Sequence, residues 1–164
     1  MKDSRVDPSA GDNFVIKWAS RYGHSEVVRL LLQDSRVDPS ADDNYAIRFA
    51  SENGHTEIVR LLLKDSRVDP CAYKEYAIGF ASRNGHLDVV ELLLQDSRVD
   101  PSADVNYAIT HAMENNHLEI VKLLIPKIDL SKITNNKILD IAKTITITIA
   151  KTITKTIPNE KIIY

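Results

Sequence analysis

Apolar positions along this chain follow a helical spacing that is interrupted at regular places. Between Asn44 and Lys74, a first block of apolar residues falls at i, i+1, i+4 and i+5, which places them on one face of a short helix. The members of this first block are Tyr45, Ala46, Phe49 and Ala50. A second helical block follows Gly54, with apolar residues at Ile58, Val59, Leu61 and Leu62. Beyond Leu63 the residues become polar, and Pro70 cannot continue a helix. The pattern predicts a helix, a tight turn, a second and longer helix, and an extended loop.

This arrangement recurs at a fixed interval. Each copy begins at the aspartate of a DSRVDP motif, and these aspartates lie 31 residues apart, at Asp3, Asp34, Asp65 and Asp96. The helix pairs are therefore expected at about 14–33, 45–64, 76–95 and 107–125. Because a unit this short cannot bury its own apolar face, the copies have to stack into one continuous core. We predict an all-α solenoid of stacked helix-turn-helix units joined by short loops, with four repeats over residues 1–126.

Small and amide residues mark the expected ends of the first helices. A left-handed residue is expected after each first helix, and these positions hold Gly23, Gly54, Gly85 and Asn116. Asparagine is the non-glycine residue that best tolerates this conformation, so the fourth copy supports the turn. Asparagine also precedes the first helix in three copies, as Asn13, Asn44 and Asn106, whereas the third copy has Glu75. We expect this asparagine to cap its helix by accepting hydrogen bonds from the first free N–H groups.

The turn and the second helix together resemble the ankyrin repeat family. The resemblance rests on GHSEVVRLLL, GHTEIVRLLL, GHLDVVELLL and NHLEIVKLLI, at residues 23–32, 54–63, 85–94 and 116–125. It implies stacked helix pairs and a protein that binds other proteins and is not an enzyme. The family unit is usually about 33 residues long, so the loop is shorter by about two residues here. The family's T-P-L-H motif is replaced in every copy, and the short unit is similar to ankyrin repeat proteins of large DNA viruses of amoebae.

Both ends of the chain depart from the repeat. Residues 135–143 still resemble a first helix, whereas residues 144–157 alternate Thr and Ile with the period of two that favours a strand. Because terminal repeats are atypical and cap the core, we expect 127–164 to form a degenerate capping repeat, a fifth helix pair with a Thr/Ile/Lys-rich tail. A strand or a disordered tail is the alternative. At the other end no helix pair precedes Phe14, which favours a fragment of a longer array, with self-association or partner binding through the first repeat as the alternative.

Composition narrows the class of protein. The net charge is −2, but residues 127–164 hold seven lysines against three acidic residues and the rest of the chain is negative. These lysines are spread out, so contact of the tail with nucleic acid or an anionic membrane is only an alternative function. The single Cys71 suits a reducing compartment, and no apolar run approaches the roughly 18 residues of a membrane span. We expect an intracellular, cytoplasmic protein (in the host cytoplasm if it is viral) that binds neither nucleic acid nor a membrane.

Candidate chemistry is sparse. Four histidines recur at the same position of the repeat, as His24, His55, His86 and His117. Metal ligands lie about 2 Å from their ion, whereas helices of successive repeats stand about 8–10 Å apart, so we expect each histidine to bond to backbone near the turn instead. Aspartate and arginine of adjacent DSRVDP loops are expected to form surface ion pairs. No nucleophile motif or phosphate-binding loop occurs, so the sequence predicts no catalytic residue, cofactor, metal site or small-molecule substrate.

Positions that differ between the copies mark a candidate partner-binding surface. They lie in the loops and at the ends of the first helices: Asp12, Asp42, Asp43, Tyr73, Lys74, Arg21, Tyr22, Glu52, Asn53, Arg83, Asn84, Glu114 and Asn115. Tyr22 and Tyr73 are the best anchors, because aromatic residues are enriched at the centres of interfaces. The sequence therefore predicts a scaffold that binds an unidentified protein through loop tips and first-helix ends. A truncated or decayed repeat fragment without a selected role is the alternative.

Overall fold

The computed structural model describes residues 6–99, 105–127 and 136–156 of the chain. Its elements are α1 (Ala10–Arg21), α2 (Ser25–Leu31), α3 (Ala41–Glu52), α4 (Thr56–Leu63), α5 (Ala72–Asn84), α6 (Leu87–Leu94), α7 (Val105–Glu114), α8 (Leu118–Leu124), a short 3₁₀ turn η1 (Ile125–Lys127) and α9 (Asn136–Thr156). These ranges contain helices and no strand, so the predicted all-α class is confirmed.

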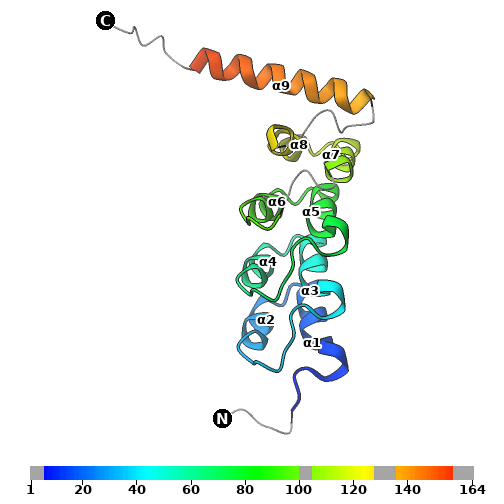
Figure 1. The fold of residues 1–164 in the computed structure, drawn as a ribbon, viewed down its shortest axis with the longest axis vertical. Coiled ribbons are helices and arrows are strands. Elements are labelled where there is room, and N and C mark those ends of the chain that lie inside the picture. Colours follow the sequence, from blue (N-terminus) through cyan, green and yellow to red (C-terminus); the bar gives the residue numbers. More distant parts are fainter. Residues whose placement is uncertain (1–5, 100–104, 128–135, 157–164) are drawn as a thin grey trace, which may run out of the picture.

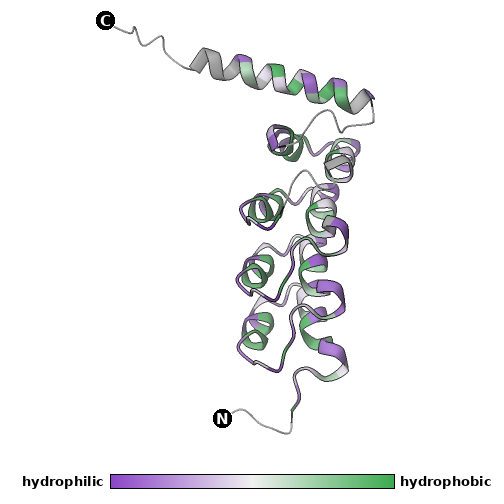
Figure 2. Ribbon diagram, in the orientation of Figure 1, coloured by the Kyte–Doolittle hydropathy of each residue, from purple (hydrophilic) through white to green (hydrophobic). Residues whose placement is uncertain are grey.

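The helices stack in two layers (Figure 1). The first helices of the pairs, α1, α3, α5 and α7, form one layer and are called the inner helices here; α2, α4, α6 and α8 form the other layer and are called the outer helices. Each inner helix packs on the next inner helix and on its own outer helix. Figure 2 shows mainly hydrophobic outer helices and hydrophilic loops. The core lies between the layers, and its largest fully buried side chains include Ile16, Ile47, Ile58, Leu62, Leu93, Ile109, Ile120 and Leu124.

The turns between paired helices are left-handed, as predicted. The backbone φ angle is +82° at Gly23, +74° at Gly54, +81° at Gly85 and +62° at Asn116. Glycine is also needed for space, because a Cβ atom on Gly54 would lie 2.6 Å from the ring of His86 in the next pair. The residue 31 positions after His117 is Thr148, so no histidine of a following repeat meets Asn116. The fourth turn can therefore carry a side chain.

The first turns of α1 and α3 each contain a short left-handed run, where the backbone is not helical. Its residues are Gly11, Asp12 and Asn13 in α1 and Asp42, Asp43 and Asn44 in α3, with φ between +50° and +64°. The asparagine that ends each run is buried, and its Oδ1 accepts a hydrogen bond from the next loop. Asn13 accepts from the N–H of Asp38 at 2.8 Å, and Asn44 accepts from the N–H of Asp69 at 2.7 Å.

The prediction that these asparagines cap their own helices is therefore wrong. An N-cap residue has extended backbone angles, from which its side chain reaches the N–H groups of the following turn. Asn13 and Asn44 are left-handed instead, and their amide oxygens join one loop to the next. The side chains of Glu75 and Asn106, at the same position of the third and fourth copies, lie outside those that the structure describes.

One arginine holds each of the three DSRVDP loops that begin at Asp34, Asp65 and Asp96. The guanidinium of Arg67 binds both carboxylate oxygens of Asp65 at 2.6 and 3.0 Å, and donates to the carbonyl oxygen of Val37 in the preceding loop at 2.8 Å. Arg36 and Arg98 make the same contacts in their loops. Ion pairs between adjacent loops were expected, but the pairs form within one loop. The loop turns back on itself there, and Asp65 also accepts the N–H of Arg67.

The Thr- and Ile-rich segment forms one helix, α9. It lies across the end of the stack beyond α7 and α8 (Figure 1), with Ala142 fully buried in the core. The expected fifth helix pair and the alternative strand are both wrong for residues 136–156, because a single helix spans them. Residues 128–135 and 157–164 of the expected capping unit lie outside the described residues.

Two features explain why α9 is helical despite its strand-like spacing. The hydroxyl groups of Thr144, Thr146 and Thr148 donate to carbonyl oxygens four residues earlier, at 2.8–2.9 Å, which satisfies them inside a helix. Among the described side chains of α9, those that pack on the core are Leu139, Ala142 and Ile145, at i, i+3 and i+6. Contact with the core thus favours the helical period over the intrinsic strand propensity of Thr and Ile.

Candidate functional site

Three of the four recurring histidines link neighbouring repeats. His55, His86 and His117 place Nε2 3.0, 3.0 and 3.1 Å from carbonyl oxygens of the preceding inner helix. Each acceptor lies two residues before the turn, at Arg21, Glu52 and Arg83 respectively. The predicted structural role is confirmed for these three histidines. His24 is exposed and makes no side-chain hydrogen bond within the described part of the chain.

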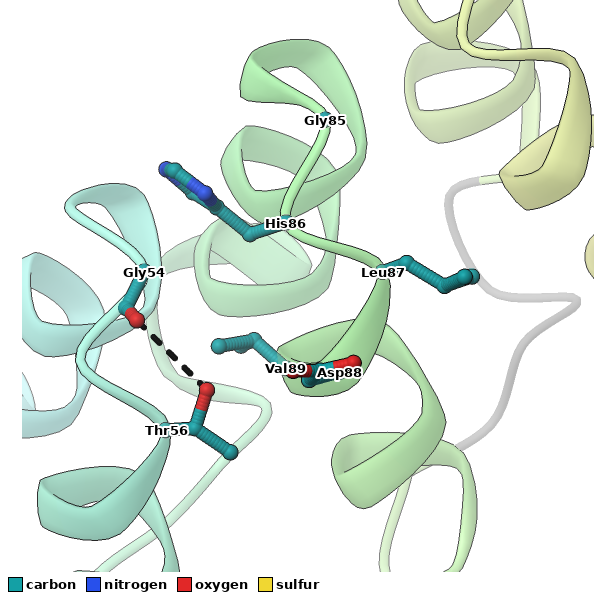
Figure 3. A pocket seen from close by; sticks show the side chains of 7 residues that line it. All are labelled: Gly54, Thr56, Gly85, His86, Leu87, Asp88 and Val89. Atoms are coloured by element: carbon teal, nitrogen blue, oxygen red, sulfur yellow. Dashed lines mark hydrogen bonds between the residues drawn. The ribbon is translucent and has the colours of Figure 1, made fainter.

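A shallow hollow lies beside His86 between two inter-helix turns (Figure 3). Its volume is about 270 Å³, and its lining residues are Gly54, Thr56, Gly85, His86, Leu87, Asp88 and Val89. Ligand pockets usually measure about 300–1,000 Å³. Figure 3 shows the His86 ring pointing toward the turn at Gly54, where it holds the Glu52 carbonyl. Among the described residues, no group of three or more His, Cys, Asp or Glu side chains is arranged to hold a metal ion.

A row of half-buried rings runs along the inner helices. Its members, in order, are Tyr45, Phe49, Tyr76, Phe80, Tyr107 and His111, and successive centroids lie 4.0–5.8 Å apart. Two hydroxyl groups join the row to the preceding repeat: Tyr45 accepts from Arg21, and Tyr76 donates to Glu52, both at 2.7 Å. Burial, together with the bond to Glu52, raises the pKa of Tyr76 above its usual value. These tyrosines stand at the first position of the segment that replaces the family's T-P-L-H motif.

The inner helix of each of the first two pairs carries an enclosed basic side chain. Lys17 has only 12% of its side chain exposed, and its Nζ lies 3.0 Å from Asp12 and 3.6 Å from Asp42. Burial alone would lower the pKa of Lys17, but the two carboxylates outweigh it and the pKa is raised. Lys17 is therefore a neutralised, largely enclosed cation.

Arg48 occupies the equivalent position in the second pair and is surrounded differently. The residue is 8% exposed, and one Nη donates to the backbone carbonyl of Asp42 at 3.0 Å. Among the described side chains no carboxylate pairs with it, and its Nε is buried without a hydrogen bond. Instead, its guanidinium carbon lies 4.8, 5.3 and 5.7 Å from the ring centroids of Tyr73, Tyr76 and Phe49. Arg48 is thus an enclosed cation stabilised by aromatic faces.

Tyr73 stands where the preceding loop has Asp42. The φ angles of Tyr73 and Lys74 are +59° and +58°, a conformation that is disfavoured for bulky side chains. The first two loops have Gly, Asp or Asn there, which tolerate it. Tyr73 is 66% exposed as a residue, and its ring covers Arg48 and meets Tyr76 edge-on at 6.2 Å. Backbone strain is thus retained at the position that presents an exposed ring to solvent.

The other predicted binding residues fall into two groups. Asn53, Asn84 and Asn115 donate to backbone carbonyls at the ends of inner helices, Arg21 and Glu52 bind tyrosine hydroxyls, Glu114 pairs with His111, and Asp12 and Asp42 face Lys17. The exposed remainder comprises Tyr22, Asp43, Lys74 and Arg83. Variation between copies was expected to mark positions without packing constraints. That expectation is wrong for the first group, because its side chains make hydrogen bonds or ion pairs within the fold.

Sequence reasoning missed Arg48. A signal was present, because position 42 supplies a carboxylate to Lys17 while the residue 31 positions later, Tyr73, cannot supply one to Arg48. A comparison of residues that face each other across two loops, copy by copy, would have shown that Arg48 lacks the counterpart of one of the two carboxylates around Lys17. Comparing the copies one position at a time did not.

A comparison with protein families matches two overlapping stretches of the chain. A family model of ankyrin repeats in three copies matches residues 16–105 and 78–144. No curated protein matches the chain. Within the described ranges, no helix is both long enough and apolar enough to cross a membrane.

Proposed function

Because the chain belongs to the ankyrin repeat family, we propose that it is a scaffold that binds one protein partner and catalyses no reaction. Ankyrin repeats generally mediate protein–protein interaction, and proteins built from them are typically not enzymes. The recognition surface of this proposal lies over the inner helices and the loops before them. Tyr73 is its centre, and Tyr22, 57% exposed at the end of α1, is its second anchor.

The observation that carries this proposal is the exposed Tyr73 ring over Arg48. Tyrosine and arginine are enriched among the residues that contribute most to interfaces. A ring that already rests on an enclosed guanidinium loses little conformational freedom when a partner covers it, so binding costs less. The left-handed backbone at Tyr73 and Lys74 supports the same assignment, since strained residues cluster at functional sites.

Site-specific cross-linking tests this surface. A photo-reactive phenylalanine analogue at Tyr73 should cross-link a partner in extracts of cells that express the chain. The same analogue at Glu91, which is exposed on the outer helix α6, should not. Tyr73→Ala with Tyr22→Ala should abolish capture by affinity pull-down while leaving helical circular dichroism unchanged. Tyr73→Phe is the matched control and should retain capture, because it keeps the ring over Arg48.

Three outcomes would contradict the proposal. Equal cross-linking from Glu91 would place the interface elsewhere or show non-specific labelling. Undiminished capture by the folded double alanine variant would remove Tyr22 and Tyr73 as anchors. Absence of any captured protein from either position would favour the alternative of a decayed repeat fragment.

A further inference from the structure

The guanidinium of Arg48 leaves empty an edge that other arginines of the chain fill with a carboxylate. Arg36, Arg67 and Arg98 each use Nε and one Nη atom to bind both oxygens of the aspartate two residues earlier. Paired bonds of this kind add strength and specificity to the contact of arginine with a carboxylate. In Arg48 one Nη atom donates to the carbonyl oxygen of Asp42, but Nε is buried and has no hydrogen-bond partner among the described residues.

The surroundings of Arg48 do not compensate for this missing acceptor. Lys17, at the same position of the first pair, has aspartate oxygens 3.0 and 3.6 Å from its Nζ. The residues that stand 31 positions after those aspartates are Asp43 and Tyr73. Asp43 is exposed and does not reach the buried Nε of Arg48, and Tyr73 brings a ring in place of a carboxylate. Because a buried donor without an acceptor destabilises the fold, an acceptor supplied from outside would bind there favourably.

This arrangement is confined to the junction of α3 with α5 among the described repeats. At the position of Arg48, the third and fourth copies have Gly79 and Thr110, so they carry no cation there. The space beside Gly79 is taken by the ring of Tyr107, which would lie 2.8 Å from an added Cβ atom. The first copy neutralises its cation within the fold. A ligand that recognises an enclosed cation is therefore directed to Arg48 at this position of the repeat.

The residues at the entrance to Arg48 also differ in charge from those of the preceding copy. Asp42 and Asp43 are replaced by Tyr73 and Lys74, so two acidic residues give way to a ring and a cation. Tyr73 and Lys74 are both exposed, and both have left-handed backbone angles. The Tyr73 ring lies against the guanidinium, with its centroid 4.8 Å from the Cζ atom of Arg48. Charge complementarity favours an approaching group that is negative.

Given the scaffold function proposed above, on which this inference rests, we propose that the protein partner inserts a glutamate or aspartate side chain beside Tyr73. Its carboxylate accepts hydrogen bonds from Nε and an Nη atom of Arg48, as Asp65 does from Arg67. The guanidinium has N–H groups besides the one bonded to Asp42, so that bond is kept. The Tyr73 ring stays on the guanidinium, and the partner packs against its exposed face. The partner is therefore a protein with an exposed acidic segment.

A library of random peptides tests this contact. Peptides displayed on phage are selected on the immobilised chain, after those that bind the Arg48→Gln variant are removed. The selected peptides should carry Asp or Glu at one fixed position. A synthetic copy with an amidated C-terminus is then compared with a second copy in which that residue is replaced by its amide, Asn or Gln. The replacement should weaken binding to the original chain about tenfold or more, measured by fluorescence anisotropy.

Two controls separate this contact from general attraction to a basic surface. Lys74→Gln should weaken binding of the acidic peptide slightly but keep the difference between the two peptides, whereas folded Arg48→Gln should remove that difference. The Nε–H signal of Arg48 in a proton–nitrogen NMR spectrum, identified by its loss in Arg48→Gln, should move downfield with the acidic peptide and not with its amide copy. The comparison of the two peptides on the original chain needs no variant, so it holds even if Arg48→Gln does not fold.

The outcomes distinguish this inference from the scaffold function. Selected peptides without a fixed acidic residue, or equal binding of the acidic and amide peptides, would overturn the inference. An Nε–H signal of Arg48 that the acidic peptide leaves unmoved would also overturn it. If the photo-reactive analogue at Tyr73 still cross-links a protein, the scaffold function stands without the acidic contact. Failure of both the cross-link and the peptide selection would remove the scaffold function together with the inference.

Discussion

The first and second helix pairs share one framework, yet equivalent residues play different roles in them. His55 links two repeats and Ala46 is fully buried, whereas their counterparts His24 and Val15 are exposed. The difference does not lie in the residues themselves, since histidine occupies both positions and valine is more apolar than alanine. It lies in the neighbour: the second pair has a helix pair before it, and the described residues place none before the first. In a stacked array, whether a residue is buried or bonded depends on the neighbouring helix pair that packs against it.

The two enclosed cations extend this comparison from packing to charge. Lys17 is neutralised by Asp12 and by Asp42 of the following loop. Arg48 meets Tyr73 at the place of Asp42, and its charge is stabilised by ring faces. The ion pairs of Lys17 are contacts within the fold. At Arg48, by contrast, the exposed ring of Tyr73 lies between the guanidinium and the solvent.

The largest difference in stability between matched variants of the two pairs is expected from a buried charge. Ala46→Asp places a carboxylate in the sealed junction between α1 and α3, and an uncompensated buried charge costs about 3–5 kcal/mol. Val15→Asp is the matched change at the exposed counterpart in the first pair and should alter the free energy of unfolding by less than about 0.5 kcal/mol. Urea unfolding followed by circular dichroism measures both. Similar losses in the two variants would show that Val15 is covered in solution.

Removing the recurring histidine should give a smaller difference in stability between the first-pair and second-pair variants. His55→Ala breaks the bond to Arg21 and leaves that carbonyl without its partner, at a cost of about 1–3 kcal/mol. His24→Ala removes no bond of the described residues and should stay within about 0.5 kcal/mol of the original chain. The same urea titrations measure this contrast. A comparable loss from His24→Ala would mean that its ring already has an acceptor.

Exchanging the partners of the two cations should have opposite effects. Tyr73→Asp gives Arg48 a carboxylate and replaces a bulky left-handed residue by one that tolerates this conformation. Relief of backbone strain stabilises the chain by roughly 1 kcal/mol or more, and loss of the cation–π contact costs a similar amount. With the new ion pair added, the free energy of unfolding should rise by up to about 1 kcal/mol. Asp42→Tyr removes one carboxylate from Lys17 and should destabilise the chain. Partner capture should be lost in Tyr73→Asp. Destabilisation by Tyr73→Asp would show that the ring, rather than the backbone, dominates the energetics there.

Sequence reasoning reached the fold because the repeat is explicit. The 31-residue interval and the glycine turns specify stacked helix pairs without knowledge of any contact between them. It failed for the loop asparagines and for α9, since both depend on contacts with another element. Asn44 bonds to the next loop, and the Thr/Ile segment becomes helical against the core. For the candidate surface, exposure of Tyr22 and Tyr73 followed from their positions, whereas the environment of Arg48 combines rings from two repeats and is invisible in one copy.

The smallest expected effect comes from the loops that join the internal pairs. Bonds from Arg67 and Arg98 hold the pKa of Asp65 and Asp96 below the ordinary value of 3.8. A carboxyl with a lowered folded-state pKa stabilises the fold above its unfolded pKa and loses this contribution as the pH falls through the folded value. Stability should therefore decline as the pH drops below about 4. The variant Arg67→Gln with Arg98→Gln should lose less than about 1 kcal/mol per loop at neutral pH and show a shallower acid decline. An unchanged acid profile in this variant would assign the decline to carboxylates outside these loops.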